Sequence, residues 1–125
     1  MLLDSNIVIY AVQPQHAKLR QFIRDRALFV SAISLIEVLG YHKLLDADRA
    51  DLEAFFRGST TIPISENIIQ QAVCLRQKHR MTLGDSIIAA TGLTHQLVLV
   101  TGNIKDFNSV EGLKIYNPLI ELPLT

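Results

Sequence analysis

The sequence contains a single cysteine, Cys74, and no long hydrophobic run. One cysteine excludes an internal disulfide, and the position of Cys74 in an apolar stretch predicts a buried helical thiol. No uninterrupted apolar run approaches the roughly 18 residues that cross a bilayer. The N-terminus also lacks the basic start of a signal peptide. We therefore expect a cytoplasmic protein with no membrane partner.

The chain has no excess of either charge, with 12 basic and 12 acidic residues. A neutral chain exerts no net field on a polyanion, which counts against a nucleic-acid partner unless a local patch supplies the attraction. One dense basic cluster, residues 76–80, offers such a patch. A solvated helix end with cations near its C-terminus explains the cluster equally well. The four histidines have no metal-ligand spacing, which argues against zinc.

Hydrophobic residues make up 49% of the 125 residues, and the mean hydropathy is +0.26. This content excludes a disordered chain and indicates a well-filled interior or an apolar surface for self-association. The length is typical of one domain. No repeat, low-complexity segment or linker divides the chain, so we expect a single domain over residues 1–125.

Short apolar stretches alternate with helical patterns along the chain. Strands are predicted just before Asp4 and at residues 28–30, 60–64, 97–101 and 114–116. One helical pattern covers residues 31–45, and the next is predicted to have Asp46 as its cap. Other helical patterns begin at Ser5, around Pro14, at Ser65 and at Thr82. Pro63 places the third strand at an edge. Strands separated by helices predict an α/β fold, a parallel sheet with helices on both faces.

Asp4 lies between two apolar stretches, Leu2–Leu3 and Ile7–Ile9. Burying a carboxylate there is costly without a partner, a proton or a metal. The simplest geometry is a short buried strand that ends at Asp4 and is followed by a helix. Ligands bind at this end of the strands in parallel α/β sheets. Asp is also a favoured N-cap, so capping explains Asp4 alone equally well.

Glu37, Asp85 and Asp106 share with Asp4 a position close after a predicted strand or at a helix start. These positions meet at one edge of a parallel sheet, where clustered carboxylates repel one another unless a divalent cation lies among them. All-oxygen donors favour Mg²⁺ or Mn²⁺. Such ions polarise a phosphodiester and help to generate a hydroxide-like water.

Capping is the alternative explanation for the same acids. The segments Ser34–Glu37 and Thr82–Asp85 match the capping-box spacing, and residues 103–106 have the composition to cap a short turn. Spacing alone therefore leaves both explanations open.

Four segments carry a resemblance to a known family. They are Asp4-Ser5-Asn6 after an apolar strand, Ile36-Glu37-Val38, residues 83–90 (LGDSIIAA) and residues 99–107 (LVTGNIKDF). In this order, over nearly the whole chain, they resemble a PIN-domain protein of the VapC toxin type. The resemblance implies a three-layer α/β/α sandwich with a central parallel sheet. It also implies endoribonuclease activity that depends on Mg²⁺, with Mn²⁺ as a substitute.

Carried over by position, the resemblance assigns Asp4 and Asp85 as the main metal ligands. Glu37 would bind metal or orient the attacking water. Asn6 and Thr101 would be supporting polar residues at the sheet edge.

The sequence departs from the family pattern at Asn103, where many PIN domains carry an acid. Either Asp106 serves as the fourth catalytic acid, or Asn103 is a neutral ligand at a weak second-metal site. We favour Asp106.

The resemblance further implies a homodimer and a cognate antitoxin whose C-terminal segment lies over the acidic groove. The RNA substrate would meet basic side chains at the rim of the groove, for which position alone suggests Arg76, Lys78, Arg80 and Lys105. The expected reaction is hydrolysis of an RNA phosphodiester by a metal-activated water, leaving a 5′-phosphate and a 3′-hydroxyl.

Two alternatives belong to other functional classes. One is a catalytically inactive PIN-like binding module, supported only by the missing acid at Asn103. The other is a phospho-acceptor receiver domain. That family would require adjacent acids after the first strand and an Asp at the end of the third, where this chain has Ser5-Asn6 and Ile64-Ser65.

Overall fold

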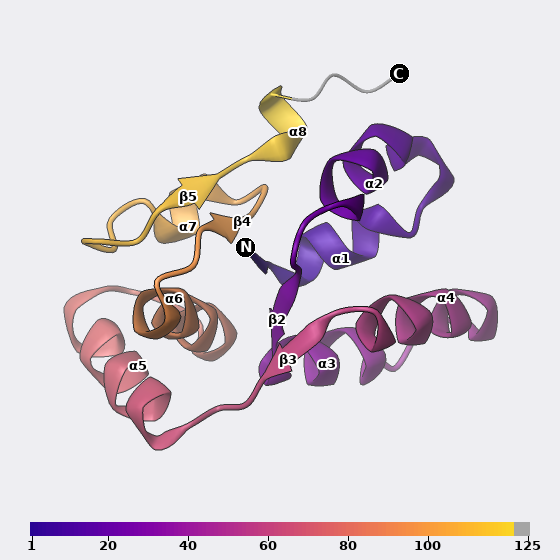
Figure 1. Ribbon diagram of the computed structural model, residues 1–125. Helices are drawn as coiled ribbons and strands as arrows, with labels where there is room; N and C mark the ends of the chain where they lie inside the picture. Colours follow the sequence, from indigo (N-terminus) through magenta and orange to yellow (C-terminus); the bar gives the residue numbers. More distant parts are fainter. Residues whose placement is uncertain (122–125) are drawn as a thin grey trace.

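The computed structural model describes residues 1–121, in which five strands form one parallel sheet (Figure 1). Their bounds are β1 Leu2–Leu3, β2 Phe29–Ser31, β3 Thr60–Ile62, β4 Leu99–Val100 and β5 Ile115–Tyr116. The strand order is β3-β2-β1-β4-β5, so β3 lies at an edge as predicted. Asp4 follows the central strand, β1, and therefore lies in the middle of the carboxyl edge.

Helices fill the connections between the strands. Their bounds are α1 Ser5–Ala11, α2 Ala17–Arg24, α3 Ala32–Leu39, α4 Asp46–Arg57, α5 Glu66–Lys78, α6 Leu83–His95, α7 Ile104–Phe107 and α8 Pro118–Glu121, with a 3-10 turn, η1, at Pro14–His16. Within residues 1–121, none of the helices has both the length and the apolar character needed to cross a membrane.

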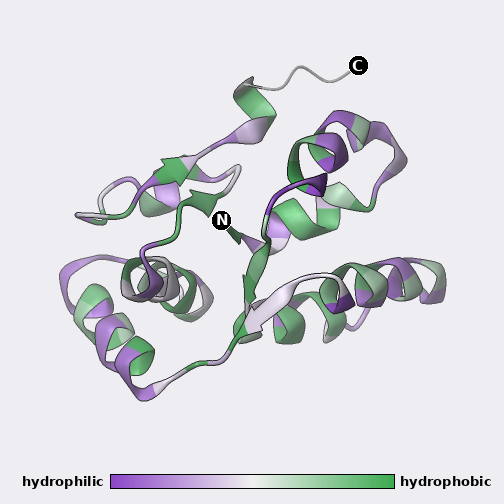
Figure 2. Cartoon of the chain, in the orientation of Figure 1, coloured by the Kyte–Doolittle hydropathy of each residue, from purple (hydrophilic) through white to green (hydrophobic). Residues whose placement is uncertain are grey.

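Successive strand residues point to opposite faces of the sheet, and each face has its own core. Leu2 and Leu99 pack with residues of α5, α6 and α7, whereas Leu3 and Val100 pack with residues of α1, α2, α3 and α4. Figure 2 shows largely apolar strands between helices that carry many polar residues. The predicted α/β/α arrangement is therefore confirmed.

Several local predictions are confirmed at helix starts. The hydroxyls of Ser65 and Thr82 accept hydrogen bonds from backbone N–H groups in the first turns of α5 and α6, as N-caps do. The helix predicted over residues 31–45 is shorter than expected. It ends at Leu39, and Gly40 follows at a position where a Cβ would collide with the carbonyl oxygen of Ile36.

Three local predictions are wrong. Ser34 does not begin a capping box, because α3 starts earlier and Ser31 is its N-cap. Asp46 is the first residue of α4 rather than its cap, a position that Leu45 occupies. Cys74 is exposed, because the buried stripe of α5 consists of Ile68, Ala72 and Leu75 and leaves Cys74 on the outer side.

Phe107 is the fully buried residue of the four-residue helix α7. We expect Phe107→Ala to lower the free energy of unfolding by about 3–5 kcal/mol, because it leaves a cavity in the core. Gln70→Ala, at an exposed position on α5, should change it by no more than about 0.5 kcal/mol. Urea denaturation measures both, and equal effects would contradict the assigned burial.

Candidate active site

Asp4 is held at the carboxyl edge of the sheet by two hydrogen bonds. The residue is buried, with only 5% of its surface exposed. The Oδ1 atom accepts from the backbone N–H of Ser5 at 2.8 Å, and Oδ2 accepts from the hydroxyl of Thr101 at 2.7 Å. Asp4 is thus the N-cap of α1, as the capping explanation requires. Its second bond, to the end of β4, is one that capping does not require.

Thr101 links Asp4 to the next loop. The backbone N–H of Asn103 donates to the Thr101 hydroxyl oxygen at 3.0 Å, which leaves the hydroxyl proton for Asp4. The Asn103 side chain makes no capping bond to α7, and Asn103 is exposed. Asn6 is exposed in the first turn of α1. Of the predicted supporting residues, Thr101 is therefore the one whose side chain contacts an acid.

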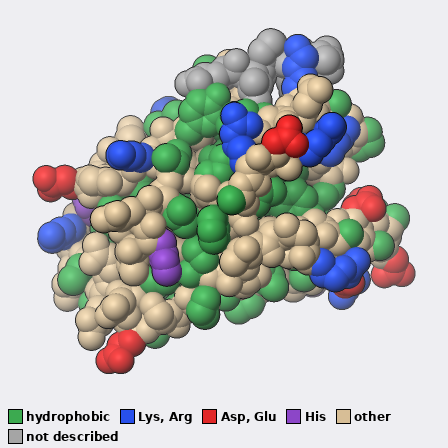
Figure 3. Space-filling model, viewed as in Figure 1, with side chains coloured by type: hydrophobic (Ala, Val, Ile, Leu, Met, Phe, Trp, Pro, Cys, Tyr) green, Lys and Arg blue, Asp and Glu red, His purple; other side chains and the backbone are tan. Residues whose placement is uncertain are grey.

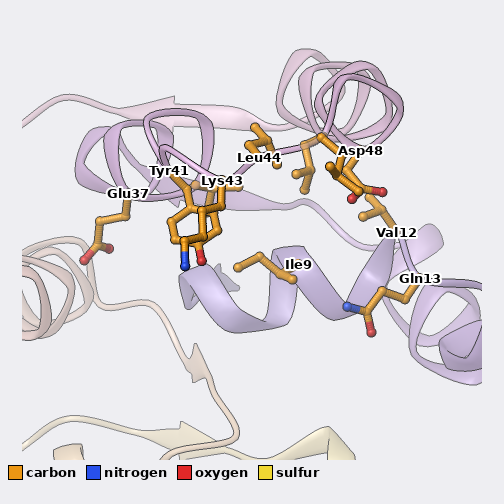
Figure 4. A pocket seen from close by; sticks show the side chains of 11 residues that line it. Ile9, Val12, Gln13, Glu37, Tyr41, Lys43, Leu44 and Asp48 are labelled. Carbon is orange, nitrogen blue, oxygen red and sulfur yellow. The ribbon is translucent and has the colours of Figure 1, made fainter.

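Glu37 extends from α3 toward the start of α6 (Figure 4). Its Oε1 atom accepts a hydrogen bond from the Ser5 hydroxyl at 2.9 Å, and the Ser5 oxygen also lies 2.9 Å from the Ser34 hydroxyl oxygen. On the other side, the carboxylate lies against Gly84. Two elements distant in sequence, the start of α1 and the start of α6, thus contact the carboxylate of the exposed Glu37 side chain.

The four predicted acids lie close enough together for their charges to act on Asp4 and Asp85. The pKa of Asp85 is raised from 3.8 to about 6, mainly by burial and then by the charges of Asp4, Asp106 and, more weakly, Glu37, against an opposing hydrogen bond from Thr82. The pKa of Asp4 is also raised, mainly by burial, with smaller contributions from Glu37 and Asp106 that its two hydrogen bonds oppose. No lysine, arginine or histidine is among the groups that shift either pKa.

This acidic cluster is open rather than closed. Within residues 1–121, no three His, Cys, Asp or Glu side chains stand close enough together to hold a metal ion directly. Mg²⁺ keeps several of its waters and is typically bound by one or two carboxylates. Because the donors are carboxylates and no cation is among the groups that shift the pKa of Asp4 or Asp85, the donor set fits a partly hydrated Mg²⁺ or Mn²⁺.

A polar pocket of about 380 Å³ adjoins the cluster, with Asp85 and Asp106 in its wall. Three of the four predicted cations, Lys78, Arg80 and Lys105, line it as well. The fourth, Arg76, is not part of the lining, and its Nε donates to the carbonyl of Met81 at 3.4 Å. The structure thus brings cations from α5, α7 and the loop after α5 next to two of the acids.

A family model described as PIN domain matches residues 1–113. The chain belongs to the PIN-domain family. Ribonuclease VapC1 of Rickettsia felis is 29% identical over 126 residues, which cover 92% of this chain and 93% of the relative. The resemblance to VapC-type PIN proteins that the four segments predict is confirmed.

Solved structures share the PIN fold. A toxin–antitoxin complex from Klebsiella pneumoniae contains a chain that is 30% identical, with a TM-score of 0.77 over 94% of this chain and 96% of that one. DNA-bound VapBC from Salmonella typhimurium gives a TM-score of 0.83 at 22% identity, over 92% of this chain and 95% of that one. The second likeness supports the fold alone.

Three residues that surround Glu37 in this PIN domain were not predicted as site residues: Ser5, Ser34 and Gly84. A weak signal for Ser34 exists in the sequence, since it lies one turn before Glu37 on the same face of α3. Gly84 interrupts the first turn of α6, where a residue with higher helix propensity is expected. Neither signal shows that the two helices meet at Glu37. His79 and Ser109 also line the polar pocket and were not predicted.

The raised pKa of Asp85 predicts a pH dependence of stability. The folded protein holds this proton up to about pH 6, whereas the unfolded chain releases it near 3.8. The free energy of unfolding of the metal-free protein should therefore fall as pH rises between these values. Because Asp85 is partly exposed, we expect a loss on the order of 1 kcal/mol.

Urea denaturation in EDTA at pH 4 and pH 7 measures this effect. Asp85→Asn should reduce the difference between the two pH values, whereas Asp25→Asn, at an exposed acid beyond α2, should preserve it. An unchanged difference in Asp85→Asn would contradict the assigned pKa.

Proposed function

We propose that this PIN-domain chain is an Mg²⁺-dependent endoribonuclease and the toxin of a toxin–antitoxin pair. The observation that carries the proposal is the convergence of Asp4, Glu37, Asp85 and Asp106 without a nearby cation among the groups that set the pKa values of Asp4 and Asp85. Two similar proteins support the proposal: one relative is a ribonuclease, and a chain 30% identical to this one comes from a toxin–antitoxin complex.

Each side chain has a defined part in this proposal. Asp4 and Asp85 bind the metal, and the Thr101 hydroxyl fixes the orientation of the Asp4 carboxylate. Glu37 binds metal or orients the attacking water. A divalent cation held there supplies Lewis-acid chemistry to the phosphodiester and its water. The products are a 5′-phosphate and a 3′-hydroxyl.

Asp106 is the proposed fourth acid, in preference to Asn103. Asp106 contributes to the raised pKa values of both Asp4 and Asp85, so its charge reaches the cluster. The Asn103 backbone instead supports Thr101. Asn103 and Asn6 are accordingly proposed as supporting residues outside the metal-binding set.

The polar pocket provides a path for the RNA backbone. Lys78, Arg80 and Lys105 offer positive charge beside Asp85 and Asp106. A phosphate next to the scissile one would bind these cations while the scissile phosphate meets the metal. Local charge thus accounts for how a chain of zero net charge binds a polyanion.

An antitoxin segment has a suitable surface in a second pocket. This pocket, of about 340 Å³, lies between α1, α3 and the start of α4, with Ile9, Tyr41 and Leu44 around it and Glu37 at its edge (Figure 4). A peptide with apolar side chains and one cation would match both the pocket and the adjacent acid. We propose this pocket as the site of antitoxin binding.

A homodimer belongs to the same proposal. Hydrophobic side chains run across the middle of the face in Figure 3, with charged ones mainly toward its margins. Exposed apolar residues on helices also include Ile36, Ile69, Val73 and Leu83. Surfaces of this kind are common at contacts between subunits.

A second candidate function is a PIN-like binding module without turnover. The open spacing of the acidic cluster is the observation that favours it. Binding of Mn²⁺ separates the two candidates, because a module that has lost its site should not bind the ion.

The first test is cleavage of total cellular RNA by the purified, antitoxin-free protein. We expect cuts with Mg²⁺ that are absent with EDTA. Asp4→Asn and Asp85→Asn should each lower the rate by more than about 100-fold, since losing even an outer partner of a metal ligand costs up to that factor. Their melting temperatures should stay at or above that of the wild type, because each change removes a poorly solvated charge. If both variants cut like the wild type, the site assignment is wrong.

The second test concerns the polar pocket. Lys78→Gln combined with Arg80→Gln should raise KM for RNA with little change in kcat. It should also reduce the slope of log affinity against log salt concentration by about 0.7 for each RNA phosphate that the protein no longer neutralises. Lys114→Gln is the matched control. Lys114 is exposed and directly precedes β5, so it lies at the amino ends of the strands, whereas the acids lie at their carboxyl ends. Equal effects of the pocket variant and the control would exclude this path.

A further inference from the structure

We infer that Ser5 and Gly84 are positioning residues that together fix the carboxylate of Glu37, and that position 84 must be glycine for the reaction and not for the fold. The inference rests on the proposed function, since it assigns a task to Glu37. It concerns residues on α1 and α6 that hold a side chain of α3.

Ser5 fixes one oxygen of the carboxylate. An ionised carboxylate only accepts hydrogen bonds, so the single hydroxyl proton of Ser5 goes to Glu37 Oε1 at 2.9 Å. The Ser34 hydroxyl, 2.9 Å from the Ser5 oxygen, then donates to Ser5. Because Ser34 is fully buried, this relay starts from an oxygen that the core of the protein holds in place.

Gly84 fixes the other side. A Cβ at position 84 would collide with Glu37 Oε2 and would lie 3.2 Å from Cδ of the same carboxylate. The three nearest atoms that this Cβ would meet all belong to Glu37. The space of the missing Cβ is therefore filled by the carboxylate, which sits between the α1 hydroxyl and the α6 backbone.

The folding cost of a side chain at position 84 is small. The atoms in its way form the end of a flexible side chain, and Glu37 is exposed enough to move toward solvent. Alanine also has a higher helix propensity than glycine, by up to about 1 kcal/mol within a helix. Gly84→Ala should thus keep the fold, or stabilise it, while it displaces the carboxylate.

The decisive comparison is Gly84→Ala against Gly58→Ala. Gly58 is the matched control, because a Cβ there meets only backbone oxygens at 3.6 and 3.8 Å. We expect Gly84→Ala to lower kcat for RNA cleavage by about 10- to 100-fold. KM should be unchanged, and the melting temperature should be unchanged or raised. Gly58→Ala should cleave like the wild type. In the metal-free protein, the ¹³Cδ resonance of Glu37 should move in Gly84→Ala and stay in place in Gly58→Ala.

Ser5 gives an independent test that does not depend on the folding of Gly84→Ala. Ser5→Ala removes the hydrogen bond to Glu37 and should lower kcat by about 10-fold. Ser5→Thr keeps the hydroxyl and should recover most of the loss. In a Glu37→Ala background, Gly84→Ala and Ser5→Ala should cause no further loss, because residues that act through one group are not additive.

The outcomes separate this inference from the proposed function. If the wild type does not cleave RNA, the proposed function fails, while the Glu37 resonance still decides whether Gly84 positions the carboxylate. If the wild type cleaves and Asp4→Asn does not, but Gly84→Ala keeps full kcat and an unmoved Glu37 resonance, the inference fails alone. Equal losses with and without Glu37 would also overturn it.

Discussion

Parallel pairing of β1 with both β2 and β4 is the constraint on which the whole candidate site depends. Leu3 is in register with Val30 on one side and with Val100 on the other. The next residue of each strand then falls level, so Asp4, Ser31 and Thr101 emerge at the same edge. The hydrogen bond from Thr101 to Asp4 joins residues 97 positions apart and exists only because of this register. Glu37 on α3 and Asp106 on α7 follow β2 and β4 at this edge, whereas Asp85 lies in the first turn of α6, which follows α5.

The resulting concentration of carboxylates opposes folding and favours ligand binding. Burial and mutual repulsion raise the pKa values of Asp4 and Asp85, so the ionised cluster destabilises the empty protein. In the proposed site, a divalent cation would offset both penalties. The concentration of carboxylates that makes the edge unfavourable on its own therefore favours a cationic ligand. Cations line the adjoining pocket, but none of them is among the groups that shift the pKa of Asp4 or Asp85.

The sequence predicts well what depends on local pattern. The apolar strands, the caps at Ser65 and Thr82 and the edge position of the third strand all follow from short-range rules, and the structure agrees. The convergence of Asp4 with the other acids was predictable because parallel strands share an edge. Cys74 was misplaced because an apolar neighbourhood in sequence does not say which side of a helix faces the core.

The contacts of the Glu37 carboxylate with Ser5 and Gly84 were not predictable for a different reason. These contacts depend on how closely α3 and α6 approach each other, which the pattern of neither helix sequence predicts. The missing side chain of Gly84 leaves room for the Glu37 carboxylate only when α3 is packed beside α6. The open spacing of the acids likewise depends on tertiary geometry.

Because α7 is only four residues long, Asp106 is held in place differently from the other acids. One turn of helix has no stability of its own, so Asp106 keeps its place through the burial of Phe107 beside it. Asp4 and Asp85, by contrast, belong to a strand end and a long helix. The position of Asp106 thus depends on core packing at Phe107 more directly than the positions of Asp4 and Asp85 do. If Asp106 is the fourth acid, as proposed, changes in packing beneath α7 would alter its position while Asp4 and Asp85 stay in place.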